Sequence, residues 1–568
     1  MNFNPAKCEI EPSSPNLSDG GDHHDDSETG HRRHSSDRDG PSLSRFDSAV
    51  LSDGLPYTIL RPLERRALSV NLSLMGLCCS ISISIYWVAL TEMMRDFNIT
   101  EEQVNLTITA YLVFQAVSPV VVSNMSDHYG RRPILLICLA GGTAANIGLA
   151  VCSTYWLLML MRCVLALFFS PIISITSSVI GDFTTRRDRG GVSGIVLGFT
   201  LIGQGIAPFL GSLFDTRWGW RAIFWFSGAY SGTVFAITLV MFPETRRSIV
   251  GNLSHRPKNW IHCSPPLLYF GKRLIDVEGS TLEPSLSLVY NPLEPLLLVK
   301  EPEVVWVLLP SAIFYCTFTM SQTSLTTNLA QEYNYSTLKI GLCFLAPGIG
   351  TVVGTVMSGK LLDIRYRSTK KKYVTRWELE KQQEGGNGAD VDNEDNVNEM
   401  NEDRSRPFEA DTEQSQSTPD GRAFPLLNII KARLSLFGWS TAVVVIFVLV
   451  YGWCSQERKS VAAVLIGSFF MTVGSQYPLS AAMTLMVDLH PQTSGAATSM
   501  NNLFRCGFGS IFVSCLAKMN TAMTLGGTYS LMAGLCLLSG VSVHVLLWKS
   551  EEILDRKAVR EARQGDSE

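Results

Sequence analysis

Two arginines in this sequence lie inside long apolar stretches. Arg162 falls within an apolar segment at 156–180, and Arg505 falls within another at 494–518. A charged side chain in hydrocarbon is costly, so it persists where it faces a polar cavity, a partner group or the membrane surface. A guanidinium can hold a carboxylate through two parallel hydrogen bonds. The two arginines therefore indicate a cavity for a small anionic ligand.

Polar neighbours extend this predicted site. Asn501 and Asn502 lie about one helical turn before Arg505 and can line the same cavity. Three amides also lie inside apolar segments: Gln115, Gln204 and Gln322. The alternative is that the arginines bind backbone carbonyls or snorkel along their helices, and that each amide makes an interhelical hydrogen bond. Because no carboxylate lies deep in these segments, we expect a substrate that bears one or more carboxylates.

Long apolar helices must position these residues. The chain has 568 residues, of which 46% are hydrophobic and 17% charged, a composition typical of membrane proteins. Segments of about twenty apolar residues are long enough to cross ~30 Å of hydrocarbon as helices. Twelve such spans are predicted, near 67–90, 103–123, 134–153, 156–180, 191–213, 222–242, 304–326, 338–359, 434–455, 460–487, 494–518 and 523–547. The predicted fold class is therefore an all-α membrane protein.

An internal repeat divides the spans into two groups of six. The sequons at Asn98 and Asn334 lie 236 residues apart, and each immediately precedes an even-numbered span. The same offset pairs Asp127 with Asp363 and Arg131 with Arg367. Parallel repeats of this kind place the substrate site between the halves, near the bilayer midplane.

Charged residues gather at one end of the predicted spans. Asp127, Arg131 and Arg132 follow the second span and Asp182 follows the fourth, while Asp363 and Arg367 repeat the pattern in the second half. These residues are candidates for a gate whose ion pairs break and reform between two states. The alternative is that they are solvated anchors at helix ends.

The fifth span combines small residues with a proline. Gly203, Gly205 and Gly211 permit close helix approach, and Pro208 removes one backbone hydrogen bond. We expect a bent helix here that acts as a hinge or seam between the halves.

Basic loops predict the orientation and the domain boundaries. Arg131, Arg132, Arg365 and Arg367 fall on the side that also holds both termini, and the positive-inside rule makes that side cytoplasmic. Asn98 and Asn334 then lie outside as candidate glycosylation sites. The predicted parts are a disordered tail at 1–60, a six-helix half at 61–245, a cytoplasmic linker at 246–303, a second half at 304–547 with a disordered insertion at about 366–430, and a tail at 548–568.

Other classes of function lack support in the sequence. The net charge is −4, and no nucleic-acid-binding motif is present, so nucleic acid is not an expected partner. The sequence contains no nucleophile elbow, HExxH motif or dinucleotide fingerprint in a plausible setting, and no CxxC pair. We expect neither an enzyme nor a metal or other cofactor. The expected partners are a small-molecule substrate, protons and membrane lipid.

Several motifs resemble those of a known transporter family. The stretch Ser123-Asn-Met-Ser-Asp127-His-Tyr-Gly130-Arg131-Arg132-Pro133 resembles the major facilitator motif between the second and third spans. The stretches 203–211 and 501–506 are similar to motifs of fungal twelve-span drug:proton antiporters, in the branch that holds quinidine-resistance, spore-wall dityrosine and citrate exporters. The resemblance implies proton-driven export across the plasma membrane.

Three functions follow as expectations. The first is a secondary active exporter of a carboxylate-bearing metabolite, such as a di- or tricarboxylic acid, in the plasma membrane. The second is an efflux transporter for drugs, toxins or secondary metabolites. The third, from another class, is a nutrient sensor that does not transport and signals through the polar tail and loop.

Overall fold

A computed structural model describes residues 58, 60–184, 186–251, 253, 260–264, 296, 299, 302–385, 429–489 and 494–550. The predicted tails at 1–60 and 548–568 lie almost wholly outside these residues, and most of the linker at 246–303 does as well. Within the described residues the chain is helical and contains no strand. The tertiary arrangement below concerns this helical unit alone.

Six spans form the first half of the bundle. The first span comprises α1 (Pro62–Ser84), the 3-10 turn η1 (Ile85–Ala89) and α2 (Leu90–Phe97), and the others are α3 (Glu101–Tyr129), α4 (Arg131–Val151), α5 (Tyr155–Phe183), α6 (Arg186–Trp218) and α7 (Trp220–Met241). Side-chain caps start two of them: the Thr100 hydroxyl accepts from the backbone N–H of Gln103, and the Thr154 hydroxyl from that of Leu157. The short helices α8 (Arg247–Val250) and η2 (Trp260–His262) follow.

The second half repeats this plan. Its helices are α11 (Pro302–Gln331), α12 (Thr337–Cys343) with α13 (Leu345–Gly385), α15 (Ile429–Leu434) with α16 (Phe437–Gln456), α17 (Val461–Leu489) and α18 (Ser494–Trp548). The described residues contain 11 helical segments long and apolar enough to cross a membrane, the last covering 52 residues. That segment is broken at Thr524, where φ is 63° and ψ is 168°, so it supplies two spans. The predicted twelve-span architecture is confirmed.

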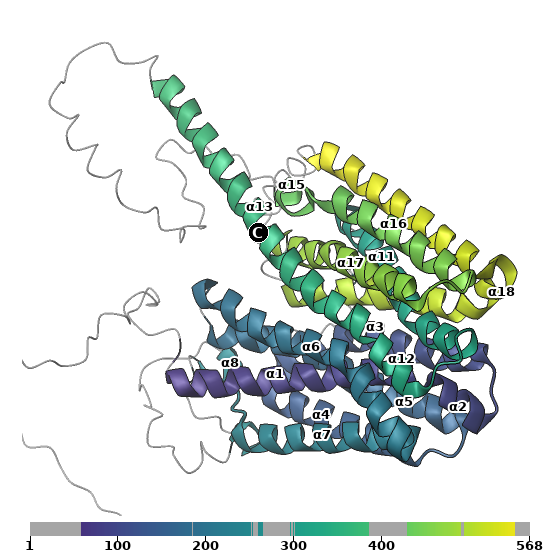
Figure 1. The fold of residues 1–568 in the computed structure, drawn as a ribbon. Helices are drawn as coiled ribbons and strands as arrows, with labels where there is room; N and C mark the ends of the chain where they lie inside the picture. The colour runs from purple at the N-terminus through teal and green to yellow at the C-terminus, as the bar shows by residue number, and fades with distance from the viewer. Residues whose placement is uncertain are drawn as a thin grey trace, which may run out of the picture. The chain divides into compact units, whose positions relative to one another are not determined.

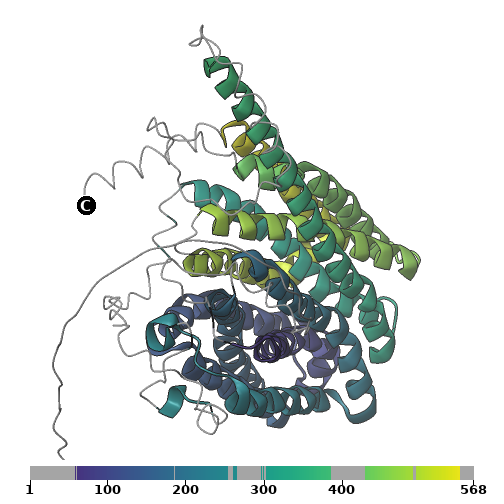
Figure 2. The ribbon, with the colours of Figure 1, turned by 90° about the vertical axis from the view of Figure 1, so that its left-hand side faces the viewer.

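Helix α13 differs from its predicted span. It continues without interruption to Gly385, far past residue 359, and extends away from the other helices in Figures 1 and 2. The first part of the insertion predicted as disordered at 366–430 is therefore helical. The remainder, 386–428, lies outside the described residues.

The two halves lie side by side and contact each other mainly through two pairs of spans. Helix α3 packs against α18, and α6 packs against α12 and α13. In Figure 1 the first half is purple to blue and the second half is green to yellow. We name the two ends of the bundle the Glu102 end and the Asp127 end, after residues near the start and the finish of α3.

The Glu102 end is closed by contacts between the halves. Lys518 of α18 forms an ion pair of 2.8 Å with Glu102 of α3. Where α6 meets α12, the half-buried side chain of Thr337 lies beside Asp215. Figure 1 shows the halves meeting near α2 and α12 and diverging toward α8.

The contact between α6 and α13 shows where the separation begins. A Cβ atom on Gly341 would meet Ser212 at 2.0 Å, and seven residues along, a Cβ atom on Gly348 would lie 2.5 Å from the carbonyl oxygen of Gly205. Seven further residues toward the Asp127 end, Gly198 occupies the same face of α6. A Cβ atom there would have no atom within 4 Å. The two helices therefore touch at the Glu102 end and separate from Gly205 toward the Asp127 end.

Candidate functional site

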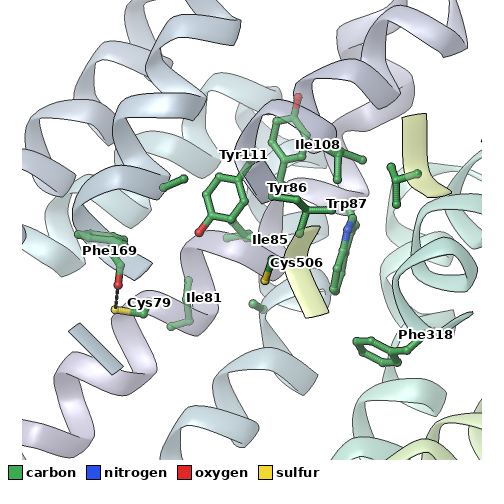
Figure 3. Packing of buried hydrophobic residues seen from close by; sticks show 14 of the residues in the cluster. Cys79, Ile81, Ile85, Tyr86, Trp87, Ile108, Tyr111, Phe169, Phe318 and Cys506 are labelled. Carbon is green, nitrogen blue, oxygen red and sulfur yellow. Dashed lines mark hydrogen bonds between the residues drawn. The ribbon is translucent and has the colours of Figure 1, made fainter. Parts of the chain in front are cut away.

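Arg162 of α5 is enclosed within the first half. Its guanidinium carbon lies 3.8 Å from the ring centroid of Tyr86 and 4.3 Å from that of Tyr111, and the residue is 2% exposed. Figure 3 shows the two tyrosines side by side, and the Tyr86 hydroxyl bonds to that of Thr107. Cation–π contacts offset part of the cost of burying the charge. Atoms Nε and Nη1 of Arg162 make no hydrogen bond to a described residue.

Arg505 of α18 lies where the halves meet and is only half-buried. Its guanidinium carbon is 4.5 Å from the ring centroid of Tyr315 on α11. Its Nε is buried and has no hydrogen-bond partner among the described residues. The ion pairs of those residues join neither Arg162 nor Arg505 to a carboxylate. An incoming anion can therefore satisfy donors that the described residues leave unpaired.

The two predicted asparagines have different surroundings. The side-chain amide of Asn502 donates a hydrogen bond of 2.7 Å to the backbone carbonyl of Gln115, which belongs to the other half. Its Oδ1 lies 3.5 Å from the sulfur of Cys506. Asn501 is 2% exposed, and its Oδ1 has no described partner. In this conformation Asn502 therefore binds the protein itself rather than presenting its amide to a ligand.

The three predicted glutamines are separated. The side-chain Oε1 of Gln115 and the Nε2 of Gln322 are buried without a partner among the described residues. Gln322 lies two turns from Tyr315 on α11, toward the Glu102 end, whereas Gln204 is half-buried on α6. The structure thus brings Gln115, Asn502 and Arg505 to one contact between the halves, and no described hydrogen bond joins Gln204 or Gln322 to it.

An aromatic cluster lies between the halves and was not predicted. The rings of Trp87 and Phe344 stack with centroids 6.3 Å apart, and Phe318 lies edge-on to Trp87 at 6.5 Å. Figure 3 shows Trp87 directed from the first half toward Phe318 of the second. All three are at most 6% exposed, so the cluster seals the Glu102 side of the contact. Aromatic residues are common throughout apolar helices, so the sequence carries no signal for this seal.

The residues of the first half that were predicted to form a gate make a charge network at the Asp127 end. Arg131 forms ion pairs with Asp127 and, through Nε at 3.3 Å, with Asp182. Its Nη1 also donates to the Ser126 hydroxyl at 2.8 Å. The guanidinium of Arg132 instead donates to the carbonyls of Leu239 and Phe242, at the end of α7. The network therefore joins α3, α4, α5 and α7 within one half.

Glu244 is a central member of this network that the site prediction omitted. Its carboxylate accepts from the backbone N–H groups of Arg131 at 2.8 Å and Arg132 at 3.2 Å, and lies 3.0 Å from Nδ1 of His262. Burial raises the pKa of Glu244, but hydrogen bonds from His262 and from backbone N–H groups outweigh burial, so the pKa lies below its ordinary value of 4.5. The carboxylate thus caps the start of α4.

The second half uses a different cation from the one predicted. Asp363 and Arg367 are exposed, and neither forms an ion pair with a described residue. Asp488, which lies near the end of α17 as Asp182 does in α5, pairs with Arg433 at 2.8 Å, and Arg433 also lies 4.5 Å from the ring of Tyr366. The offset of 236 residues fails here because the insertion separates α13 from α15. A basic residue directly before the ninth span was the available signal.

The predicted hinge residues form a seam along α6. Gly203 faces Leu77 and Ser80 of α1, whereas Gly205 faces the backbone of Gly348 across the contact between the halves. Gly211 faces Ile85, and the Pro208 carbonyl lies beside Gly341. Helix α6 therefore runs between a helix of its own half and one of the other half.

The two sequons occupy equivalent positions. Asn98 and Asn334 are exposed, follow α2 and α11 at the Glu102 end, and have left-handed φ values of 51° and 50°. The same strained turn recurs at the same place in each half, in agreement with the internal repeat.

Comparison with known proteins agrees with this architecture. Residues 72–376 match the Major Facilitator Superfamily model. The chain is 34% identical to the multidrug transporter QDR2 of Candida glabrata over 90% of its length and 85% of that protein. It is 33% identical to quinidine resistance protein 1 of Saccharomyces cerevisiae, over 91% of this chain and 88% of that protein. It is 31% identical to citrate exporter 1 of Aspergillus niger, over 89% of this chain and 90% of that protein.

A solved structure supports the fold. The D-xylose–proton symporter superposes with a TM-score of 0.56 at 12% sequence identity, covering 85% of this chain and 97% of that chain. The twelve spans, the paired halves and the relatives lead to one conclusion: the chain is a multi-pass membrane transporter, not an enzyme, and belongs to the major facilitator superfamily, in the fungal twelve-span drug:proton antiporter family.

Proposed function

We propose that this protein is a proton-coupled exporter of a small carboxylate-bearing metabolite. The observation that carries the proposal is the guanidinium of Arg505, which lies at the contact between the halves with a buried Nε that no described residue satisfies. A buried donor left unpaired costs free energy, and a carboxylate is the ligand that best pairs with a guanidinium. One of the relatives named above is a citrate exporter, which supports the same class of substrate.

The orientation is part of the proposal. The basic residues Arg131, Arg132, Arg365 and Arg367 lie at the Asp127 end, which the positive-inside rule assigns to the cytoplasm. The exposed Asn98 and Asn334 then face the exterior, where they are available for glycosylation. In this orientation the structure is sealed toward the outside and open toward the cytoplasm. A transporter in this state is ready to receive a cytoplasmic substrate for export through the plasma membrane.

Metabolite profiling tests the substrate class. Culture medium and cell extracts are compared between cells that lack this protein and cells that overproduce it. We expect a carboxylate to decrease in the medium of the first and to accumulate in that of the second. Arg505→Ala should abolish this accumulation, whereas Arg458→Ala, which removes an exposed arginine paired with Glu332, should preserve it. Unchanged acids in both strains would contradict the proposal.

A multidrug exporter is the second candidate. The names of two relatives describe drug or quinidine resistance, and aromatic side chains lie beside the proposed site at Tyr315 and Phe318. Such rings bind flat apolar or cationic compounds. In that case, loss of the protein should sensitise cells to quinidine, and Arg505→Ala should leave resistance largely intact because the guanidinium would not contact the drug.

A further inference from the structure

Helices α3 and α5 of the first half, like α6, each contain a proline that leaves one backbone carbonyl without its helical partner. Proline has no N–H, so the carbonyl four residues earlier receives no hydrogen bond from it. Pro119 of α3 frees the carbonyl of Gln115 in this way, and Pro171 of α5 frees that of Leu167. Both carbonyls lie within the membrane-spanning part of their helices, where an unsatisfied backbone carbonyl is costly.

Serines satisfy these two carbonyls reciprocally. Ser170 of α5 donates to the carbonyl of Gln115 at 3.0 Å, and Ser118 of α3 donates to the carbonyl of Leu167. Each serine directly precedes the proline of its own helix. The two Ser-Pro pairs therefore join α3 to α5 within the first half.

One of the two carbonyls also accepts a second hydrogen bond. A carbonyl oxygen has two lone pairs, so the bond from Ser170 leaves the Gln115 carbonyl able to accept once more. Asn502 of α18 occupies this position at 2.7 Å, and Asn502 belongs to the other half. The carbonyl of Leu167 accepts no comparable bond from the second half among the described residues. The carbonyl that Pro119 frees thus accepts one hydrogen bond from its own half, through Ser170, and one from the opposite half, through Asn502.

We propose that Asn502 is a positioning residue for transport, which holds α18 against α3 through the carbonyl that Pro119 frees and so favours the conformation closed at the Glu102 end. The same two helices carry the Lys518–Glu102 ion pair about four turns away, at the closed end itself. Opening of that end must move α18 relative to α3 and break the bond between Asn502 and Gln115. The proposal concerns the change between states and does not depend on which substrate is carried.

Crosslinking between α3 and α18 measures the closed population. The double change Glu102→Cys and Lys518→Cys, in a chain whose exposed Cys515 is replaced by Ser, is treated with a short bifunctional methanethiosulfonate. We expect Asn502→Ala to lower the ratio of crosslinked to free chain about fivefold, the change that loss of one hydrogen bond gives. Asn502→Leu, which keeps the side-chain volume, should do the same if the alanine variant folds poorly.

The origin of the acceptor is tested through the prolines. Pro119→Ala restores an N–H that competes for the Gln115 carbonyl, so it should lower the crosslinked fraction, and adding Asn502→Ala should then have little further effect. Pro171→Ala is the matched control, and it should leave the crosslinked fraction unchanged because its carbonyl binds within one half. An unchanged fraction in both folded Asn502 variants would overturn the proposal. Fully additive effects of Pro119→Ala and Asn502→Ala would overturn the role of the proline.

Discussion

The two intramembrane arginines occupy different environments. Arg162 is enclosed between two tyrosine rings, whereas Arg505 lies half-buried against one ring at the contact between the halves. A ligand that enters between the halves can reach Arg505 directly, and it can reach Arg162 only if Tyr86 or Tyr111 moves. This difference favours Arg505 over Arg162 as the substrate contact of the proposed function. It also explains why the burial of Arg162 is tolerated in the absence of a ligand.

At Gly130, backbone conformation and available space both exclude a side chain. Its φ is +103°, and a Cβ atom would lie 2.5 Å from Oε2 of Glu244. Gly219 has a φ of +80° but open space around it, so it serves as a matched control. We expect Gly130→Ala to lower the apparent melting temperature of the purified protein by several degrees more than Gly219→Ala. Equal losses would show that the carboxylate contact contributes nothing beyond backbone strain.

The pKa of Glu244 predicts a pH dependence of stability. Because this pKa lies below 4.5 in the folded protein, the stabilisation is fully present above that pH and is lost as the pH falls through the folded-state pKa. Glu244→Gln should therefore lower the apparent melting temperature at neutral pH, and the gap to the parent protein should narrow at about pH 4 and below. Thermal unfolding of both proteins in detergent at several pH values measures this difference in melting temperature. A gap of constant size would refute an ionised Glu244.

Among the helices, the seam between α6 and α13 controls how closely the halves approach. Gly205 and Gly348 touch through their backbones, and a Cβ atom on Gly205 would lie 2.9 Å from the carbonyl oxygen of Gly348. Gly205→Ala should thus push the helices apart and lower the crosslinked fraction at Glu102 and Lys518 severalfold. Gly198→Ala, on the same face but in open space, should not. If both variants crosslink like the parent, the seam does not hold the closed end.

The sequence predicts the helices better than their contacts. Span length and apolar composition are local properties, so all twelve spans could be predicted from the chain. The break at Thr524 separates the last two of them. The helical start of the insertion, from 366 to Gly385, could not be predicted because its polar composition resembles that of a loop. Composition alone does not reveal whether a polar segment continues the helix before it.

The site could be predicted only in part, because the sequence shows which residues are unusual but not which residues they contact. Arg505, Asn502 and Gln115 were identifiable because polar groups inside apolar spans are rare. The hydrogen bond between Asn502 and Gln115 could not be predicted, because it depends on how α18 lies against α3. Likewise, Glu244 and Arg433 lie at helix ends, where charges are common, so their places in the sequence did not reveal which groups they bind.

For the whole molecule, the closed Glu102 end and the open Asp127 end predict one-sided access. In a chain with Cys515→Ser, Gly198→Cys should react with a membrane-impermeant thiol reagent from the cytoplasmic side. Asn98→Cys, which is exposed at the Glu102 end, should react from the outer side. Labelling of intact cells and of inverted vesicles separates the two. The proposed orientation would be contradicted if Gly198→Cys reacted in intact cells but not in inverted vesicles.

The most direct test of the central claim is transport by the purified protein in proteoliposomes. Counterflow is measured with labelled mono-, di- and tricarboxylates, including citrate, and with quinidine, for the parent protein, Arg505→Ala and Arg458→Ala. The account predicts counterflow of at least one carboxylate that Arg505→Ala reduces at least tenfold, a loss of about 1.4 kcal/mol or more, and that Arg458→Ala preserves. Quinidine counterflow that Arg505→Ala leaves intact, with no flux of any carboxylate, would contradict it.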